Sequence, residues 1–91
     1  MKVRFTATAL AELDRIAQYI ARDNPAAAAT VVSRVEQLTD RLAEFPQMAY
    51  ATDEDGVRVV LVGRFPYLIF YTVRDREVVV LHVRHAARLR L

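Results

Sequence analysis

The chain has 91 residues, 54% of them hydrophobic and none of them cysteine, and its formal net charge is +2 at pH 7. This length favours a single domain over residues 1–91, and without cysteine neither a disulfide nor a thiolate metal site can form. No stretch reaches the roughly 18 apolar residues of a membrane span, and the first residues lack the apolar region of a signal peptide, so we expect a cytoplasmic protein.

The N-terminal half predicts a strand and two helices. Residues 2–6 alternate in polarity around Val3 and Phe5, as in a short strand. Thr6 or Thr8 can then cap a helix over residues 8–22, because a hydroxyl accepts a hydrogen bond from a free helical N–H. The apolar residues of that segment share one helical face: Leu10, Leu13, Ile16, Ala17 and Ile20.

A tight joint at Asn24-Pro25 separates this helix from the next. Proline disfavours helical geometry in the residue before it and suits the first position of a helix. Asn24 is therefore the expected cap of a second helix over residues 25–44, which Phe45-Pro46 ends. The short joint predicts an antiparallel helical hairpin.

The second half changes to the period of strands. Residues 57–62, 67–73 and 77–84 are the expected strands, joined by turns at 63–66 and 74–76, so neighbouring strands should be antiparallel. The overall prediction is an α+β fold with an N-terminal strand, an antiparallel helical hairpin and then an antiparallel sheet.

The middle strand carries bulky side chains on both of its faces. Tyr67, Ile69, Tyr71 and Val73 alternate with Leu68, Phe70 and Thr72. One face should lie against the helical hairpin. The other is only partly polar, so we expect a partner to cover it, although scattered apolar residues are also normal on a small sheet.

Few features of the sequence suggest catalysis. There is no glycine-rich phosphate loop, His82 and His85 lack the spacing of metal ligands, and Asp53-Glu54-Asp55 is most simply a solvated loop, so we expect no cofactor and no metal. RNA cleavage remains conceivable, with arginines stabilising charge and a histidine as general base. Its candidate residues are Arg58, Arg64, His85 and Arg88.

Basic side chains gather near the C-terminus. From Leu81 onwards the chain has no acidic residue but carries His82, Arg84, His85, Arg88 and Arg90. Such an edge would attract phosphates or an acidic protein surface, and the alternative is a solvated terminal tail.

Over nearly all of its length the chain resembles the RelE/ParE superfamily of toxins from type II toxin–antitoxin systems. The order and spacing of several pieces carry the resemblance. These are Phe5-Thr6 before a helix with Leu13, Ile16, Tyr19 and Ile20; Asn24-Pro25; Gly56-Val57-Arg58; Tyr67-Leu68-Ile69-Phe70-Tyr71; and residues 79–88.

The resemblance implies partners as well as a fold. It implies a cognate antitoxin, ParD-like, that wraps the toxin with an extended or helical segment. It implies no sequence-specific DNA binding by the toxin alone. The residues that we expect to contact the antitoxin are Leu13, Ile20, Tyr67, Ile69 and Tyr71. Those that we expect to contact the target are Arg84, His85, Arg88 and Arg90.

Within the superfamily, RelE-like members cut mRNA on the ribosome and ParE-like members poison DNA gyrase. When the RelE pattern is laid on the strands at Tyr67 and Val79, its two catalytic lysines fall on Val59 and Leu61 and an arginine falls on Leu68. Its C-terminal tyrosine lies beyond Leu91, and only Arg88 has a match.

These mismatches favour a ParE-like toxin that inhibits gyrase by binding, with no catalytic residues of its own. Two alternatives stay open. One is a ribosome-dependent mRNA endoribonuclease, and the other is a non-toxic interaction module.

Overall fold

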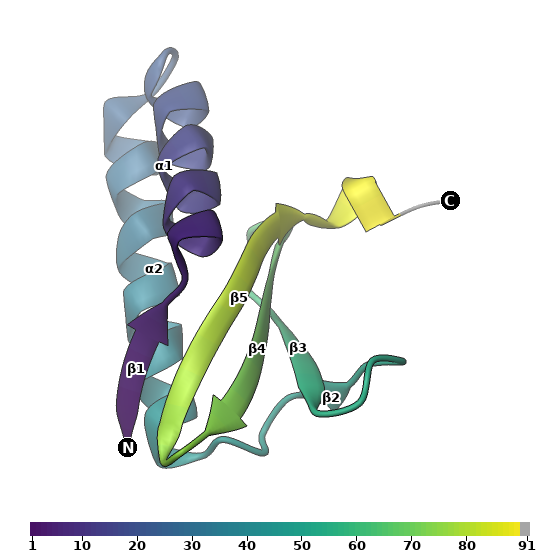
Figure 1. Ribbon diagram of the computed structural model, residues 1–91. Helices are drawn as coiled ribbons and strands as arrows, with labels where there is room; N and C mark the ends of the chain where they lie inside the picture. Colours follow the sequence, from purple (N-terminus) through teal and green to yellow (C-terminus); the bar gives the residue numbers. More distant parts are fainter. Residues whose placement is uncertain (90–91) are drawn as a thin grey trace.

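The computed structural model describes residues 1–89, in which two helices lie on one side of a curved sheet (Figure 1). Both helices begin close to their predicted starts. In chain order the elements are β1 (Lys2–Phe5), α1 (Ala7–Ala21), α2 (Pro25–Glu44), β2 (Tyr50–Ala51), β3 (Val57–Leu61), β4 (Tyr67–Arg74), β5 (Glu77–His85) and a short 3-10 helix, η1 (Ala86–Leu89). Neither helix has the length and apolarity needed to cross a membrane.

The sheet has five strands in the order β1-β5-β4-β3-β2. The neighbours from β2 to β5 are antiparallel, whereas β1 lies parallel to β5, with Phe5 opposite Val80. The predicted α+β fold is therefore confirmed, with a mixed rather than a purely antiparallel sheet. The helical hairpin is the crossover that parallel neighbours require, because a tight turn cannot join them. The edge strand β2 was not predicted, since two residues carry no periodic pattern.

Side-chain caps fix the starts of both helices. The Thr6 hydroxyl accepts a hydrogen bond from the Ala9 N–H at 3.1 Å and donates one to the Leu81 carbonyl oxygen at 3.2 Å. The Asn24 side chain accepts from the Ala27 N–H at 3.0 Å, with Pro25 in the first turn of α2. Thr6, rather than Thr8, is thus the cap of α1, and it also ties the helix to β5.

The core lies between the helical hairpin and the inner face of the sheet. Along β4 the inward side chains of Tyr67, Ile69 and Tyr71 are buried, whereas Leu68 and Phe70 point to the side without helices. The other fully buried large side chains come from α2, from β5 and from the residue that follows β3: Val31, Val35, Leu42, Val62, Val78, Val80 and Val83. The sheet therefore has one covered face and one open face.

A β-bulge on β5 sets which residues reach the open face. Tyr71 pairs with Val80 but Phe70 pairs with His82, so Leu81 is the additional residue. Because side chains alternate along a strand, the shift places Val83 on the inner face and His82 on the outer one.

Candidate functional site on the open face of the sheet

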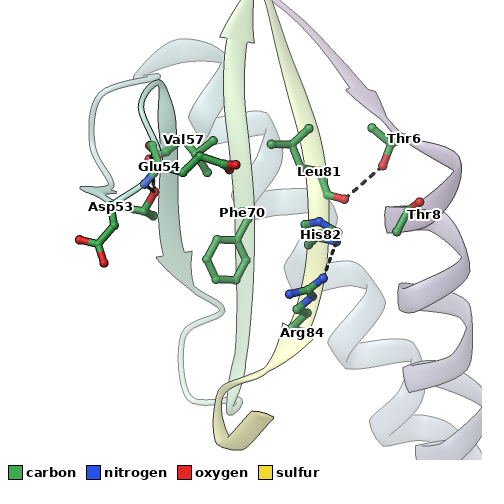
Figure 2. Close-up of a pocket in the computed structure, with 10 residues that line it drawn as sticks. Thr6, Thr8, Asp53, Glu54, Val57, Phe70, Leu81, His82 and Arg84 are labelled. Carbon is green, nitrogen blue, oxygen red and sulfur yellow. Dashed lines mark hydrogen bonds between the residues drawn. The ribbon is translucent and has the colours of Figure 1, made fainter. Parts of the chain in front are cut away.

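The open face contains a shallow hollow of about 720 Å³ (Figure 2). Val57, Phe70 and Leu81 give it an apolar floor. His82 and Arg84 line one side, and Asp53 and Glu54 line the side across Phe70. Hydroxyl groups from the start of α1 and from the end of β2 complete the rim: Thr6, Thr8 and Thr52.

The apolar floor continues along β3 and β4 beyond the hollow. Val59 pairs with Phe70 and Leu61 pairs with Leu68, and directly opposed residues of an antiparallel pair share one face of the sheet. Leu61 keeps 50% of its surface exposed. The positions where the RelE pattern would place two lysines and an arginine therefore lie together on the open face as Val59, Leu61 and Leu68.

A carboxylate from α1 anchors the basic side of the hollow. Glu12 Oε1 accepts a hydrogen bond from the Val83 N–H at 3.1 Å and lies 3.2 Å from His82 Nδ1. Glu12 Oε2 lies 3.4 Å from the Nε of Arg84. Arg84 in turn places Nη2 3.2 Å from His82 Nδ1. The three side chains form one network, although Glu12 is 70 positions from His82 and 72 positions from Arg84 in the sequence.

The acidic side of the hollow is a turn built around Thr52. The Thr52 hydroxyl accepts from the Glu54 N–H at 3.2 Å, and the Thr52 N–H donates to the Val57 carbonyl at 3.0 Å. Gly56 turns the chain at a φ of 76°, in the left-handed region that glycine adopts at low cost. The acidic loop expected from the sequence therefore has a fixed place at the rim.

Two of the nuclease candidates, Arg58 and His85, lie apart from each other. The Nη1 of Arg58 donates to the Ala49 carbonyl at 2.8 Å, which holds the start of β2. His85 Nδ1 accepts from the Ala87 N–H at 3.1 Å, and its ring meets that of Tyr67 edge-on at 5.3 Å. Arg58 pairs with Tyr71 and His85 pairs with Tyr67, so roughly 13 Å of β4 separates them. Arg64 lies in the β3–β4 turn, and the side chain of Arg88 is outside the described part of the structure.

Of the basic C-terminal residues expected to contact the target, the two whose side chains the structure describes, Arg84 and His85, lie on opposite faces of β5. Arg84 lies on the open face, whereas His85 lies on the face towards the helices, because consecutive strand residues point to opposite sides. Arg88 belongs to η1, but its side chain and the whole of Arg90 lie outside the described residues.

Of the residues expected to contact the antitoxin, the three on β4 are buried and the two on α1 are partly buried. Ile69 and Tyr71 are 0% exposed and Tyr67 is 9% exposed, while Leu13 and Ile20 pack on the core from α1. Burial raises the pKa of the Tyr71 hydroxyl, with Arg58 acting in the opposite direction. Burial, and then the nearby Tyr19, raise the pKa of Tyr67. On β4, the face that remains open to a partner is the opposite one, with Leu68 and Phe70.

Sequence reasoning did not identify Glu12 as part of the site. Its position beside the apolar residues of α1 is ordinary for a solvated helix residue, and only the packing of α1 on β5 brings it to His82 and Arg84. Among residues 1–89, no three side chains of the kinds that bind metal are grouped to hold an ion.

Comparisons with known proteins agree with this geometry. Residues 3–90 match the family model described as the ParE toxin of the type II toxin–antitoxin system parDE. A putative toxin, Y4kP, from Sinorhizobium fredii is 39% identical over 85 residues, which cover 93% of this chain and 88% of the relative. Toxin RelE2 of Caulobacter vibrioides is 38% identical over 88 residues, covering 97% of this chain and 98% of that protein.

A solved structure shares the fold. A chain from the structure titled "Chromosomal ParDE TA system from P. aeruginosa" matches with a TM-score of 0.80 and 23% identity. The match covers 93% of this chain and 95% of the other.

Proposed function

Because this chain belongs to the family of ParE toxins of type II toxin–antitoxin systems, we propose that it inhibits its target by binding and that the target is DNA gyrase. A cognate, ParD-like antitoxin neutralises it in this proposal. The family match covers nearly the whole chain, so it includes the open face and the hollow.

The observation that carries inhibition by binding is the apolar character of the open face. Val59, Leu61 and Leu68 lie there side by side, at the positions where a RelE-like nuclease would carry basic groups. Aliphatic side chains cannot hold a scissile phosphate or stabilise the charge that develops on it. An apolar face of this kind is suited to contact with protein instead.

The likeness to Toxin RelE2 supports a second candidate function, a ribosome-dependent endoribonuclease. That function would need Arg58, Arg64, His85 and Arg88 to act together. The different placements of Arg58 and His85 weigh against it, because catalytic groups must reach the same substrate atoms.

We propose that the antitoxin covers the open face. Leu61, Leu68 and Phe70 supply apolar surface there, and the basic and acidic sides of the hollow can orient a charged segment. The relative from the ParDE system supports a partner of this class. An antitoxin segment over the hollow would also cover Arg84, the described member of the proposed target-binding set on that face, and would thereby exclude the target.

A supercoiling assay with purified gyrase tests the proposal. Increasing amounts of the toxin should inhibit supercoiling, and prior mixing with the co-encoded antitoxin should restore it. Arg84→Ala should raise the toxin concentration needed for half-inhibition by about tenfold or more, as expected for loss of one charge-assisted hydrogen bond. Arg15→Ala, which removes an exposed charge on α1, is the matched control.

Undisturbed supercoiling at a large molar excess of active, folded toxin would refute gyrase as the target. Primer extension on translated mRNA then tests the second candidate, which requires toxin-dependent cuts that Arg88→Ala abolishes. Normal growth of bacteria that express the chain without antitoxin would favour a non-toxic interaction module.

A further inference from the structure

The carboxylate of Glu12 completes the edge of β5 where β1 ends. The pairing of β1 with β5 stops at Phe5 and Val80, and the last backbone bond of that edge is from the Thr6 N–H to the Val80 carbonyl. Further along β5, beyond the end of β1, Glu12 Oε1 accepts a hydrogen bond from the Val83 N–H. The Glu12 side chain is only 17% exposed, so its position is fixed by α1 and by this backbone bond.

The same carboxylate competes with Arg84 for one ring nitrogen of His82. His82 Nδ1 lies 3.2 Å from Glu12 Oε1 and 3.2 Å from Arg84 Nη2. An imidazole nitrogen either carries a proton and donates, or lacks one and accepts. Nδ1 can therefore donate to Glu12 or accept from Arg84, but it cannot do both.

We propose that Glu12 is a positioning residue for Arg84, and that the protonation of His82 decides how firmly the guanidinium is held. When His82 is neutral and its one ring proton is on Nε2, Arg84 is held at two points, through Nη2 to His82 Nδ1 and through Nε to Glu12. When Nδ1 carries the proton, His82 donates to Glu12 and Arg84 Nη2 faces another donor. Only the 3.4 Å contact between Nε and Glu12 Oε2 then remains.

Release of Arg84 follows directly from this exchange. A contact of 3.4 Å is at the long end for a charge-assisted hydrogen bond, and the Arg84 side chain is already 42% exposed. A protonated ring beside the guanidinium adds repulsion between like charges. Once Nδ1 carries the proton, Arg84 moves away from Glu12 towards the hollow and the solvent.

Other groups around His82 do not replace either partner. Thr8 on α1 and Phe70 on β4 also line the hollow but are uncharged, and Asp53 and Glu54 lie on its far side (Figure 2). Within residues 1–89, neither of these acids forms a hydrogen bond or ion pair with His82 or Arg84. The competition is therefore confined to Glu12, His82 and Arg84.

The consequence for activity rests on the proposed role of Arg84 in target binding. Glu12 partly neutralises the Arg84 guanidinium. An acidic group of the target therefore meets the full positive charge of Arg84 only after the contact with Glu12 is broken. Glu12→Gln keeps an acceptor for the Val83 N–H and removes the negative charge. This variant should inhibit the target at a concentration several-fold lower than the unmodified toxin.

Nuclear magnetic resonance of the full-length toxin tests the positioning without any target. The order parameter of the Arg84 side chain should fall from about 0.8 near pH 8 to below about 0.6 near pH 5.5. His82→Asn should make the order parameter independent of pH, and Glu12→Gln should make it low at both values. An Arg84 that is equally ordered at both pH values in the unmodified toxin overturns the proposal, as does a pH dependence that survives His82→Asn.

The unmodified toxin and His82→Asn decide the matter even if Glu12→Gln does not fold. The supercoiling assay separates this inference from the proposed function. If Arg84 responds to pH as expected but neither Arg84→Ala nor Glu12→Gln alters inhibition, the target-binding role of Arg84 fails while the positioning by Glu12 stands.

Discussion

The hydroxyl of Tyr71 donates a hydrogen bond of 2.7 Å to the carbonyl oxygen of Pro46, 25 residues earlier in the chain. Tyr71 is completely buried in the middle of β4, and Pro46 lies in the connection that follows α2. The bond therefore fastens this connection to the centre of the sheet. Together with the bond from Arg58 to Ala49, it fixes the path of the chain into β2, next to the acidic rim of the hollow.

Tyr71→Phe should lower the free energy of unfolding by about 1–3 kcal/mol, because the partly buried hydrogen bond to the Pro46 carbonyl is lost. Urea denaturation followed by circular dichroism measures the change. Tyr50→Phe is the matched control, since Tyr50 is 78% exposed, and its stability should stay within about 0.5 kcal/mol of the unmodified chain. Equal effects of the two substitutions would show that the bond to Pro46 contributes nothing.

Because Tyr71 is buried, we expect the protein to lose stability at alkaline pH. Burial raises the pKa of Tyr71 and of Tyr67 in the folded chain above the usual value of 10.0. The unfolded chain then releases these protons first, so the free energy of unfolding is fully present below about pH 10 and falls as the pH rises towards the folded-state pKa values.

Urea midpoints measured between about pH 8 and pH 11 test this dependence. The decline should be shallower in Tyr71→Phe than in the unmodified chain, because one of the two shifted groups is gone. A decline of identical steepness in both proteins would show that Tyr71 does not cause it.

The cap of α1 gives a third prediction with an internal control. Thr6→Ala removes the acceptor of the Ala9 N–H and the donor to the Leu81 carbonyl, and should cost about 1–2 kcal/mol of stability. Thr8→Ala, two residues later on an exposed position, should be nearly neutral. Thermal or urea denaturation of the two variants measures the difference, and the reverse order of their stabilities would be incompatible with Thr6 as the cap.

The open face gives a prediction for the antitoxin. Leu61→Asp places a charge on the apolar surface proposed to be covered and should weaken antitoxin binding by roughly 10- to 100-fold, as measured by calorimetry. Val73→Asp changes a similarly exposed residue near the far end of β4, on the side away from the hollow floor, and should leave the affinity unchanged.

Stability in the presence of the antitoxin checks the same interface independently. A partner that binds only the folded toxin raises its melting temperature by mass action. The increase should be large for the unmodified toxin and for Val73→Asp and small for Leu61→Asp. An unchanged melting temperature of the unmodified toxin with saturating antitoxin would rule out this partner.

The sequence by itself determined the family, both helices and every strand except β2. The Asn24-Pro25 joint, the helical spacing of apolar residues before and after it, and the alternation from Tyr67 to Thr72 all act over a few residues, so local patterns suffice to predict them. The superfamily followed because these pieces occur in a particular order over nearly the whole chain.

Only the tertiary structure decided which face of the sheet is covered and which residues meet. Alternation shows that Tyr71 and Phe70 lie on opposite faces, but packing against the hairpin makes Tyr71 interior and leaves Phe70 in the hollow. Glu12 reaches His82 and Arg84 because α1 crosses β5 where β1 ends, a contact between residues about 70 positions apart. Local periodicity carries no information on such contacts, since they depend on how whole elements dock.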